Sequence, residues 1–349
     1  MSDGLALTLA ARGSAMCSSD FCVGGVAVRL TGDDSAAVAL VPSLVAFRSE
    51  AGMPDIRVRV EWIEKLTSAP GLQLFDSGAL WRLYECEAGF QFDFRAPVFG
   101  DQPYKRLLVD RDFSRATLQM SAEVSAAFPY AAPLGYPVDE LLIMHRLTRE
   151  KAVELHSCGI VRVNGTGNLF VGHSGAGKST TARLWMERED VEILSDDRII
   201  VRRDSAADSA GEHEVLGLRD CSASRGGHCT QDDRAKQVPH RAFSPVRNDK
   251  GMRMYGTPWH GEAAYASPGS APLARIFVLE HGQGNVLTRL SPSQAVAELF
   301  ARSFVPFYRH EYVESALEFL QELVGAVPCY RYAFEPNEAA VERILELRD

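Results

Sequence analysis

The sequence predicts an α/β fold in which a P-loop domain follows a β-rich N-terminal domain. Two stretches and one pattern support this prediction. The stretch VGHSGAGKSTTARLW, residues 171–185, follows a short apolar run and leads into a helix-forming run. The stretch VEILSDD, residues 191–197, is a second apolar run that ends in two acids. In residues 1–136, apolar and polar side chains alternate in several places, as they do in half-buried strands.

The N-terminal part, residues 1–136, is expected to form a β-rich (α+β) accessory domain. Phe90, Phe92 and Phe94 alternate with polar residues, which is the two-residue period of a half-buried strand. The stretch YKRLLVDRDFSRATLQM predicts two strands joined by a turn. This part contains no motif with catalytic chemistry, so its role stays open.

The second domain is expected over residues 137–349 and begins with a helix. Pro137 stands near the start of that helix, and two acids follow it. The stretch GIVRVNGTGNLFVG then predicts two strands around a tight Asn-Gly turn. Further on, LARIFVLEH predicts a buried strand. Three amphipathic helices are expected to complete the domain, at residues 291–302, 311–325 and 337–347.

Residues 204–252 differ in composition from the rest of this domain. Gly, Ser, Asp, Arg and Pro dominate, and the hydrophobic pattern has little periodicity. We therefore expect an inserted, largely disordered loop. Its histidines and cysteines fit no standard zinc-finger spacing, which favours a solvated loop over a metal site.

Composition excludes several classes of protein. The net charge of −9 argues against nucleic acid and anionic membranes as main partners. No stretch reaches about 18 consecutive apolar residues, so no spanning helix is expected. Asp3 stands where a signal peptide needs positive charge, and the seven cysteines are scattered, as is typical of reduced thiols. These features predict a cytoplasmic protein and leave a homo-oligomer open.

The glycine-rich stretch matches the phosphate-binding pattern G-x-x-x-x-G-K-[ST]. Glycines allow several backbone N–H groups to point into one concavity, and the start of the following helix adds a positive dipole end. Lys178 can reach the β- and γ-phosphates of a nucleotide and support their transfer, while the Ser179 hydroxyl can hold Mg²⁺. The predicted nucleotide-binding residues are Gly172, His173, Ser174, Gly175, Ala176, Gly177, Lys178, Ser179 and Thr180.

Two acids follow the next apolar run, which predicts a short strand ending at Asp196 and Asp197. Only about one short helix separates this strand from the loop. The strand should therefore end at the same edge of the sheet, where ligands bind in open α/β folds. Adjacent carboxylates at that edge suit Mg²⁺ binding and proton abstraction. The alternative is that one Asp merely caps a turn.

Together these elements resemble the catalytic domain of HPr kinase/phosphorylase and its relatives. The shared features, in order, are a His at the opening of a strand, a hairpin, the P-loop, a short helix and a strand ending Asp-Asp-Arg. The resemblance is strong over residues 137–202 and weaker over 253–349. It implies an HPr-kinase-like P-loop catalytic domain with a core related to ATP-dependent phosphoenolpyruvate carboxykinase.

The resemblance also implies roles for individual residues. The family phosphorylates serine hydroxyls, on a small carrier protein in its namesake and on a peptide in some relatives. Gly172–Ser179 would bind ATP, and Asp196 would accept the proton of the acceptor hydroxyl. His156 would lie beside Asp196 and tune its charge. Asp197 would hold Mg²⁺ together with Ser179.

One part of the family pattern is missing. The namesake has a Glu-rich, Arg-Gly signature after its Asp pair, and here YGTPWHGE, residues 255–262, stands instead. Within it, Glu262 or His260 is a candidate for a metal or phosphate contact. Trp259 is either a core residue or a wall of the substrate site. The missing signature argues against the carrier protein as acceptor and against reverse phosphorolysis.

The function expected from the sequence is an ATP- and Mg²⁺-dependent kinase that acts on a serine-type hydroxyl of a peptide, protein or small molecule. Two other interpretations stay open. One is a nucleotide-binding regulator or scaffold that transfers no phosphoryl group. The other is a carboxykinase-like or hydrolytic enzyme, although a carboxykinase needs further basic residues for a small dianionic substrate.

Overall fold

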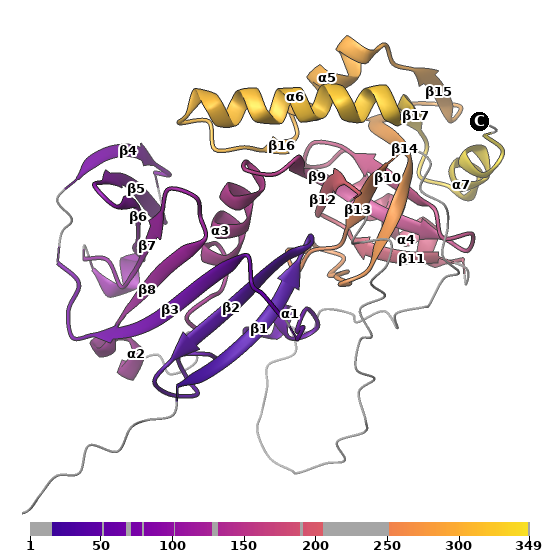
Figure 1. The fold of residues 1–349 in the computed structure, drawn as a ribbon. Helices are drawn as coiled ribbons and strands as arrows, with labels where there is room; N and C mark the ends of the chain where they lie inside the picture. The colour runs from indigo at the N-terminus through magenta and orange to yellow at the C-terminus, as the bar shows by residue number, and fades with distance from the viewer. Residues whose placement is uncertain are drawn as a thin grey trace, which may run out of the picture.

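The protein is mostly β, as a computed structural model shows. The structure describes residues 16–347 except 51, 68–70, 79, 101, 128–131, 189–190 and 205–250. Strands make up 41% and helices 23% of the described residues, and the strands form two large mixed sheets of eight and nine strands (Figure 1). The predicted α/β P-loop domain is therefore wrong as a fold class. The expected disordered insertion at 204–252 lies almost wholly outside the described residues.

The first sheet contains the strands of the N-terminal part, in the order β1-β2-β3-β8-β7-β6-β5-β4. Their bounds are β1 Cys17–Val23, β2 Val26–Gly32, β3 Ile56–Ile63, β4 Leu72–Asp76, β5 Trp81–Cys86, β6 Gly89–Phe94, β7 Lys105–Asp110 and β8 Arg115–Ser121. Short helices accompany them, namely α1 Pro42–Val45, η1 Pro97–Phe99 and α2 Ala122–Ala127. The predicted strand–turn–strand is confirmed as the antiparallel pair β7–β8.

Strand β6 differs from its prediction in one respect. Phe90, Phe92 and Phe94 face the hydrophobic core as expected, but the intervening Gln91 and Asp93 are buried too. Asp93 accepts two hydrogen bonds from the guanidinium of Arg106, at 2.6 and 3.0 Å. A buried charge of this kind is tolerated because it is paired and hydrogen-bonded. The strand is thus buried on both faces rather than half-buried.

The second sheet contains the remaining strands, in the order β10-β9-β12-β13-β14-β17-β15, with β11 and β16 also paired to β9. Their bounds are β9 Ala152–Arg162, β10 Gly167–Val171, β11 Val191–Ser195, β12 Arg198–Arg203, β13 Met252–Tyr255, β14 Ser270–His281, β15 Val286–Arg289, β16 Ser303–Phe304 and β17 Cys329–Phe334. Strand β9 pairs antiparallel with four neighbours. Antiparallel neighbours need no helical crossover, which is why this part is not an α/β sheet.

Helices cover both faces of the second sheet. On one face, α5 Pro292–Phe300 and α6 His310–Ala326 bury Leu299, Phe319 and Leu323. On the other face, α4 Lys178–Met186 and α7 Glu338–Leu345 bury Trp185 and Ile344. The three C-terminal helices predicted from the sequence are therefore confirmed, with ends shifted by a few residues.

Helix α3, Val138–Leu147, lies between the two sheets (Figure 1). Its Leu141 belongs to the same core cluster as residues of the first sheet, Ile200 of the second sheet and Trp259, which follows β13. The predicted domain division at residues 136/137 falls in the connection that leads into this helix.

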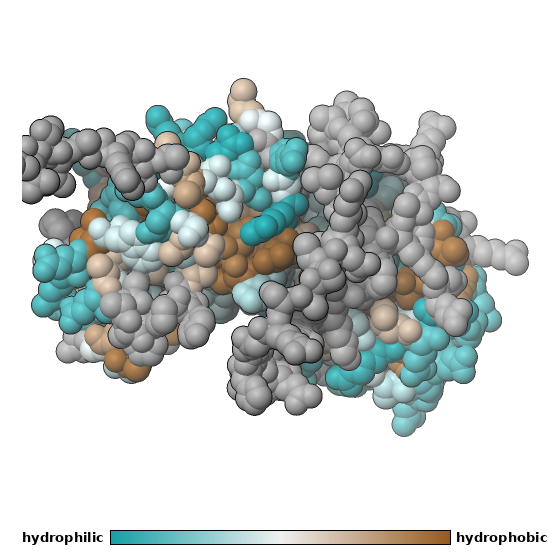
Figure 2. All heavy atoms as spheres, turned by 90° about the horizontal axis from the view of Figure 1, so that it is seen from below, coloured by the Kyte–Doolittle hydropathy of each residue, from teal (hydrophilic) through white to brown (hydrophobic). Residues whose placement is uncertain are grey.

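Among the described residues, no helix has both the length and the apolar character needed to cross a membrane. In the coloured part of the face seen from below, one group of hydrophobic residues lies near the centre, and hydrophilic residues lie mainly toward the edges (Figure 2).

Candidate functional site

Strand β9 brings the predicted site residues together from distant parts of the sequence. On one side, Ser157 of β9 pairs with Val171 at the end of β10, directly before the glycine-rich loop. On the other side, His156 pairs with Arg198 at the start of β12, directly after the two acids. The backbone N–H of Gly172 also donates to the carbonyl of His156 at 3.3 Å. The loop and the acids therefore flank the same point of β9.

The loop has the local form that the motif predicts, a strand followed by a glycine-rich turn and a helix. It runs from Val171, the last residue of β10, to Lys178, the first residue of α4. Gly175 and Gly177 have φ values of 79° and 103°, a region that favours glycine. His173, Ser174 and Gly175 at the crest are exposed. The crest of the loop is thus open to an incoming ligand.

The side chain of Lys178 points back into the loop. Its ammonium donates to the carbonyls of Gly172 and His173, each at 3.1 Å, and the residue is only 6% exposed. Burial lowers the pKa of Lys178 below its ordinary value, against the raising effect of the Asp197 charge. The charged nitrogen therefore lies inside the concavity that the loop encloses.

Asp196 is buried behind the loop. Its carboxylate accepts hydrogen bonds from the backbone N–H groups of Gly261, Ala263 and Tyr265, at 3.1, 2.9 and 3.3 Å. The hydroxyl of Ser179 lies 3.5 Å from its Oδ2 atom. Asp196 thus connects the start of α4 to the turn at residues 261–265.

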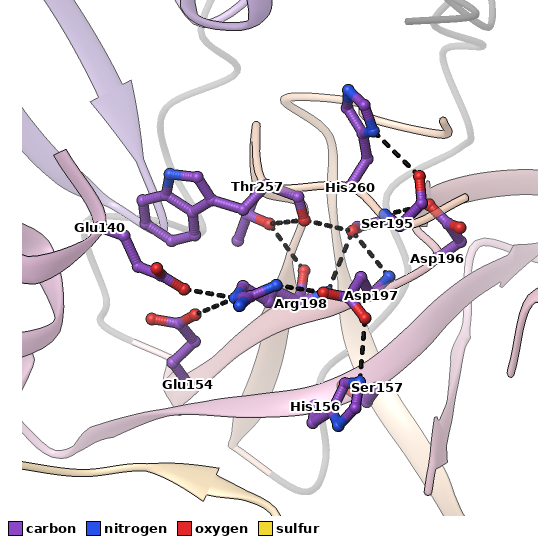
Figure 3. Close-up of polar contacts among 12 residues, drawn as sticks. Glu140, Glu154, His156, Ser157, Ser195, Asp196, Asp197, Arg198, Thr257 and His260 are labelled. Carbon is purple, nitrogen blue, oxygen red and sulfur yellow. Dashed lines mark hydrogen bonds and ion pairs between the residues drawn. The ribbon is translucent and has the colours of Figure 1, made fainter. Parts of the chain in front are cut away.

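Asp197 points the other way, toward β9. The Nε2 atom of His156 lies 2.9 Å from its Oδ1, and Arg198 forms an ion pair with its Oδ2 (Figure 3). Burial alone would raise the pKa of Asp197, but the hydrogen bond to His156 and the positive charge of Arg198 outweigh it, so the pKa lies below its ordinary value. The side chains of His156 and Asp197 are 24% and 20% exposed, so a substrate can reach this pair.

The two acids therefore have the opposite partners from those expected. The resemblance paired His156 with Asp196, and Ser179 with Asp197. In the structure His156 contacts Asp197, and Ser179 lies beside Asp196. The physical reason is the turn that begins at Ser195, which directs the consecutive side chains to opposite sides.

Ser195 holds that turn in place, and its role was not foreseen from the sequence. Its hydroxyl accepts the backbone N–H groups of Asp197 and Arg198 at 3.3 and 3.2 Å and donates to the carbonyl of Trp259 at 3.3 Å. The Thr257 hydroxyl donates to the Arg198 carbonyl at 2.7 Å. A serine directly before two acids was the only local signal, and it is a weak one.

The segment YGTPWHGE supplies the Thr257 hydroxyl and backbone groups to the site. Trp259 is 5% exposed and donates from Nε1 to Asp139 at 3.0 Å, so it is a core residue and not a substrate wall. Glu262 is exposed, between the two residues whose N–H groups hold Asp196. The Nδ1 atom of His260 lies 3.1 Å from the carbonyl of Gly261.

The described residues contain no group of three or more His, Cys, Asp or Glu side chains that could hold a metal ion by themselves. The pair of Ser179 hydroxyl and Asp196 carboxylate, 3.5 Å apart, nevertheless fits Mg²⁺, which keeps several waters and takes phosphate oxygens as further ligands. In the part of the chain that the structure describes, Ser179 forms no side-chain hydrogen bond with Asp197 or Glu262. The residues present therefore fit Mg²⁺ at Asp196, whereas the sequence predicted Asp197 and Glu262.

No model of a known protein family and no curated protein matches this chain. The fold and the site define a mostly β protein with a glycine-rich loop between a strand and a helix and two divergent acids beside it. The functional argument rests on the geometry of that site.

Proposed function

We propose that the protein is an ATP-dependent phosphotransferase that moves the γ-phosphoryl group to a serine-type hydroxyl of a peptide, protein or small molecule. One observation carries this proposal. A glycine-rich loop with a buried lysine lies next to a pair of acids, one beside Ser179 and the other beside His156. The resemblance of the His, loop and Asp-Asp-Arg elements to HPr kinase supports the choice of a serine-type acceptor.

The loop and the start of α4 bind the triphosphate. The exposed crest supplies backbone N–H groups, and the N-terminal end of a helix attracts anions. The ammonium of Lys178 now bonds two carbonyls of the loop, and phosphate oxygens replace those acceptors when the nucleotide enters. A charge-assisted bond to phosphate is stronger than one to a neutral carbonyl, so the exchange is favourable.

Ser179 and Asp196 would hold Mg²⁺, which neutralises negative charge on the β- and γ-phosphates when it is bound. Asp196 suits this role because three backbone N–H groups fix its carboxylate beside the Ser179 hydroxyl. It is less suited to accept a proton, because it is only 1% exposed.

Asp197 takes the proton of the acceptor in this scheme. The acceptor oxygen forms a bond to the γ-phosphorus while the bond from that phosphorus to the β–γ bridging oxygen breaks, and ADP leaves. The hydroxyl proton passes to the Asp197 carboxylate, which is anionic at neutral pH. Its lowered pKa makes it a weaker base than an ordinary carboxylate, so it accepts the proton as the bond to phosphorus forms. His156 donates a hydrogen bond to Asp197 and keeps it in place.

We also propose a cytoplasmic location, where ATP is abundant. Cys86, Cys158 and Cys329 are free thiols in the structure, which is typical of proteins in reducing compartments.

The test compares Asp197→Asn with Asp196→Asn in transfer of label from γ-labelled ATP to a hydroxyl acceptor. Loss of a general base typically slows a reaction by about 100-fold or more, so D197N should lose transfer while its ATP affinity by calorimetry stays within about twofold of the wild type. D196N should weaken binding of ATP in the presence of Mg²⁺. The control is Asp112→Asn, whose side chain is 76% exposed in a turn of the first sheet.

Unchanged transfer by D197N would remove Asp197 from the mechanism. Wild-type protein that binds ATP but labels no acceptor in a cell extract would instead support a regulator or scaffold. Decarboxylation of oxaloacetate would support the carboxykinase-like alternative.

A further inference from the structure

Arg198 is held from four sides next to the proposed proton acceptor. Its Nη1 atom forms an ion pair with Asp197, and its Nε atom faces the carboxylates of Glu140 and Glu154, the second at 3.4 Å. The ring of Phe304 lies against the guanidinium, 4.6 Å from its central carbon to the ring centroid. The side chain is 16% exposed. Figure 3 shows the carboxylates converging on Arg198 from different elements.

These partners come from separate parts of the fold. Glu140 lies on α3, Glu154 on β9 and Phe304 on β16. The same Phe304 ring also packs edge-on against His156, with 6.1 Å between the ring centroids. Arg198 therefore links the Asp197–His156 pair to α3, the helix between the two sheets.

We propose that Arg198 is a positioning residue that fixes the carboxylate of Asp197 against His156 for the transfer step. The inference rests on the proposed function of that pair. A guanidinium suits this task because its nitrogens are fixed in one plane, so Nη1 can donate to Asp197 while Nε lies within ion-pair distance of Glu140. A lysine ammonium is a single point of charge and cannot hold both partners in this way.

The arrangement favours a geometric role over a purely electrostatic one. A lone arginine beside Asp197 would make the carboxylate a weaker base. Here the carboxylate of Glu140 offsets the charge of Arg198 from the other side. The net result is a fixed orientation of Asp197 with less loss of basicity than an unpaired arginine would cause.

The same strand provides a matched control. Arg202 lies four residues after Arg198 on β12, so the two side chains share a face of the strand. Arg202 also forms an ion pair with a glutamate, Glu150, at 2.6 Å and is 18% exposed. Arg202 also donates to the carbonyl of Gly24 in the N-terminal part of the chain, and not to Asp196 or Asp197. Loss of this ion pair tests general destabilisation without touching Asp197.

The experiment measures kcat and KM for phosphoryl transfer, together with ATP affinity by calorimetry, for Arg198→Lys, Arg198→Met and Arg202→Met. Misplacement of a reacting group by about 1 Å can cost up to about 100-fold in rate, so R198K and R198M should lower kcat by roughly 10- to 100-fold. Their ATP affinities should stay within about twofold of the wild type, since neither change touches the loop. R202M should leave kcat and KM within about twofold of the wild-type values.

R198M leaves the buried carboxyl groups of Glu140 and Glu154 without their cation, which can destabilise the protein. The double variant R198M/E140Q removes one of these acids, and the same kinetic measurements are made on it. Wild-type kcat in R198K would overturn the inference, as would an equal loss in R202M. If the wild type itself transfers no phosphoryl group, the proposed function fails, and a crystal structure of R198K decides the positioning role. An Asp197 carboxylate still bonded to His156 as in the wild type would then overturn it, whereas a displaced carboxylate would support it.

Discussion

Gly177 provides a direct test of how the loop is built. Its φ is 103°, and a Cβ atom added to it would lie 2.5 Å from the ring of Phe334 on β17. Gly175 is its natural comparison, because its φ is 79° but a Cβ atom there meets nothing within 4 Å. Replacing each glycine by alanine therefore separates the backbone strain from the steric clash.

The two replacements should differ in magnitude. A residue with a Cβ atom in the left-handed region costs about 1–2 kcal/mol, which applies to both positions. Overpacking a well-filled site costs about 1–3 kcal/mol more, and this applies to Gly177→Ala alone. G177A should therefore lose about 1–3 kcal/mol beyond the loss in G175A, which corresponds to roughly 5- to 150-fold in an equilibrium constant.

The assay has two parts, because strain in the loop can lower either global stability or the population of the binding-competent loop. Urea unfolding gives the free energy of unfolding, and calorimetry gives the ATP dissociation constant. The loss of unfolding free energy plus the loss of ATP-binding free energy should be larger for G177A than for G175A. The variant Phe334→Ala and the double variant G177A/F334A complete a double-mutant cycle.

The double-mutant cycle of G177A and F334A can refute the proposed clash between position 177 and the Phe334 ring. If the Phe334 ring causes the clash, the double variant loses less than the sum of the two single variants. Strict additivity, or equal losses in G175A and G177A, would show that the ring does not limit the side chain at position 177.

Three further predictions concern other buried groups. Burial lowers the pKa of His145 to about 4 from 6.5, so the unfolded chain takes up a proton before the folded one does, and stability falls as the pH drops between these values. Relative to His145→Phe, the wild type should lose about 3 kcal/mol of unfolding free energy between pH 7 and pH 4, and a constant difference in urea titrations would contradict this. Lys178→Ala should weaken ATP binding by roughly tenfold or more, since it removes a charged donor to phosphate, and an equal affinity by calorimetry would argue against the loop assignment. Trp259→Phe leaves the buried carboxylate of Asp139 without its 3.0 Å donor and should lower the unfolding free energy by about 1–3 kcal/mol, so an unchanged urea midpoint would count against that bond.

Local elements were predictable because their signals lie within a few residues of one another. Helix α5 has Pro292 at its first turn and a capping box between Ser291 and Gln294, and it begins one residue after its predicted start. The strand, glycine-rich turn and helix around Lys178 likewise follow from residue types at fixed spacing. Steric and capping preferences of this kind act over one or two turns of chain and need no tertiary partner.

The fold class was not predictable in the same way. The loop motif specifies a strand before it and a helix after it, but not which strands surround them. Strand β9 pairs antiparallel with β10, β11, β12 and β16, and the last of these begins at Ser303. Such pairing depends on contacts between segments that are distant in the sequence. The hydrophobic pattern of a single sequence does not reveal which of these segments pair.

The site shows the same division. The sequence singled out Lys178, Ser179 and the two acids as candidates, and the structure exchanges the expected partners of the two acids. Glu140 and Phe304 had no local signal at all, because each reaches Arg198 only through the packing of α3 and β16 around β9. Their sequence positions differ from that of Arg198 by far more than any local motif spans.

The sequence by itself determined the short-range chemistry of this protein, namely a glycine-rich turn that can expose its N–H groups, a lysine and a serine at its end, and two acids after an apolar run. Tertiary structure alone decided that the fold is mostly β and which acid lies beside Ser179 and which beside His156. The reason is physical. Backbone conformation depends on neighbouring residues, whereas the direction of each carboxylate depends on the hydrogen bonds that Ser195 and the turn at 261–265 form after the strands have paired.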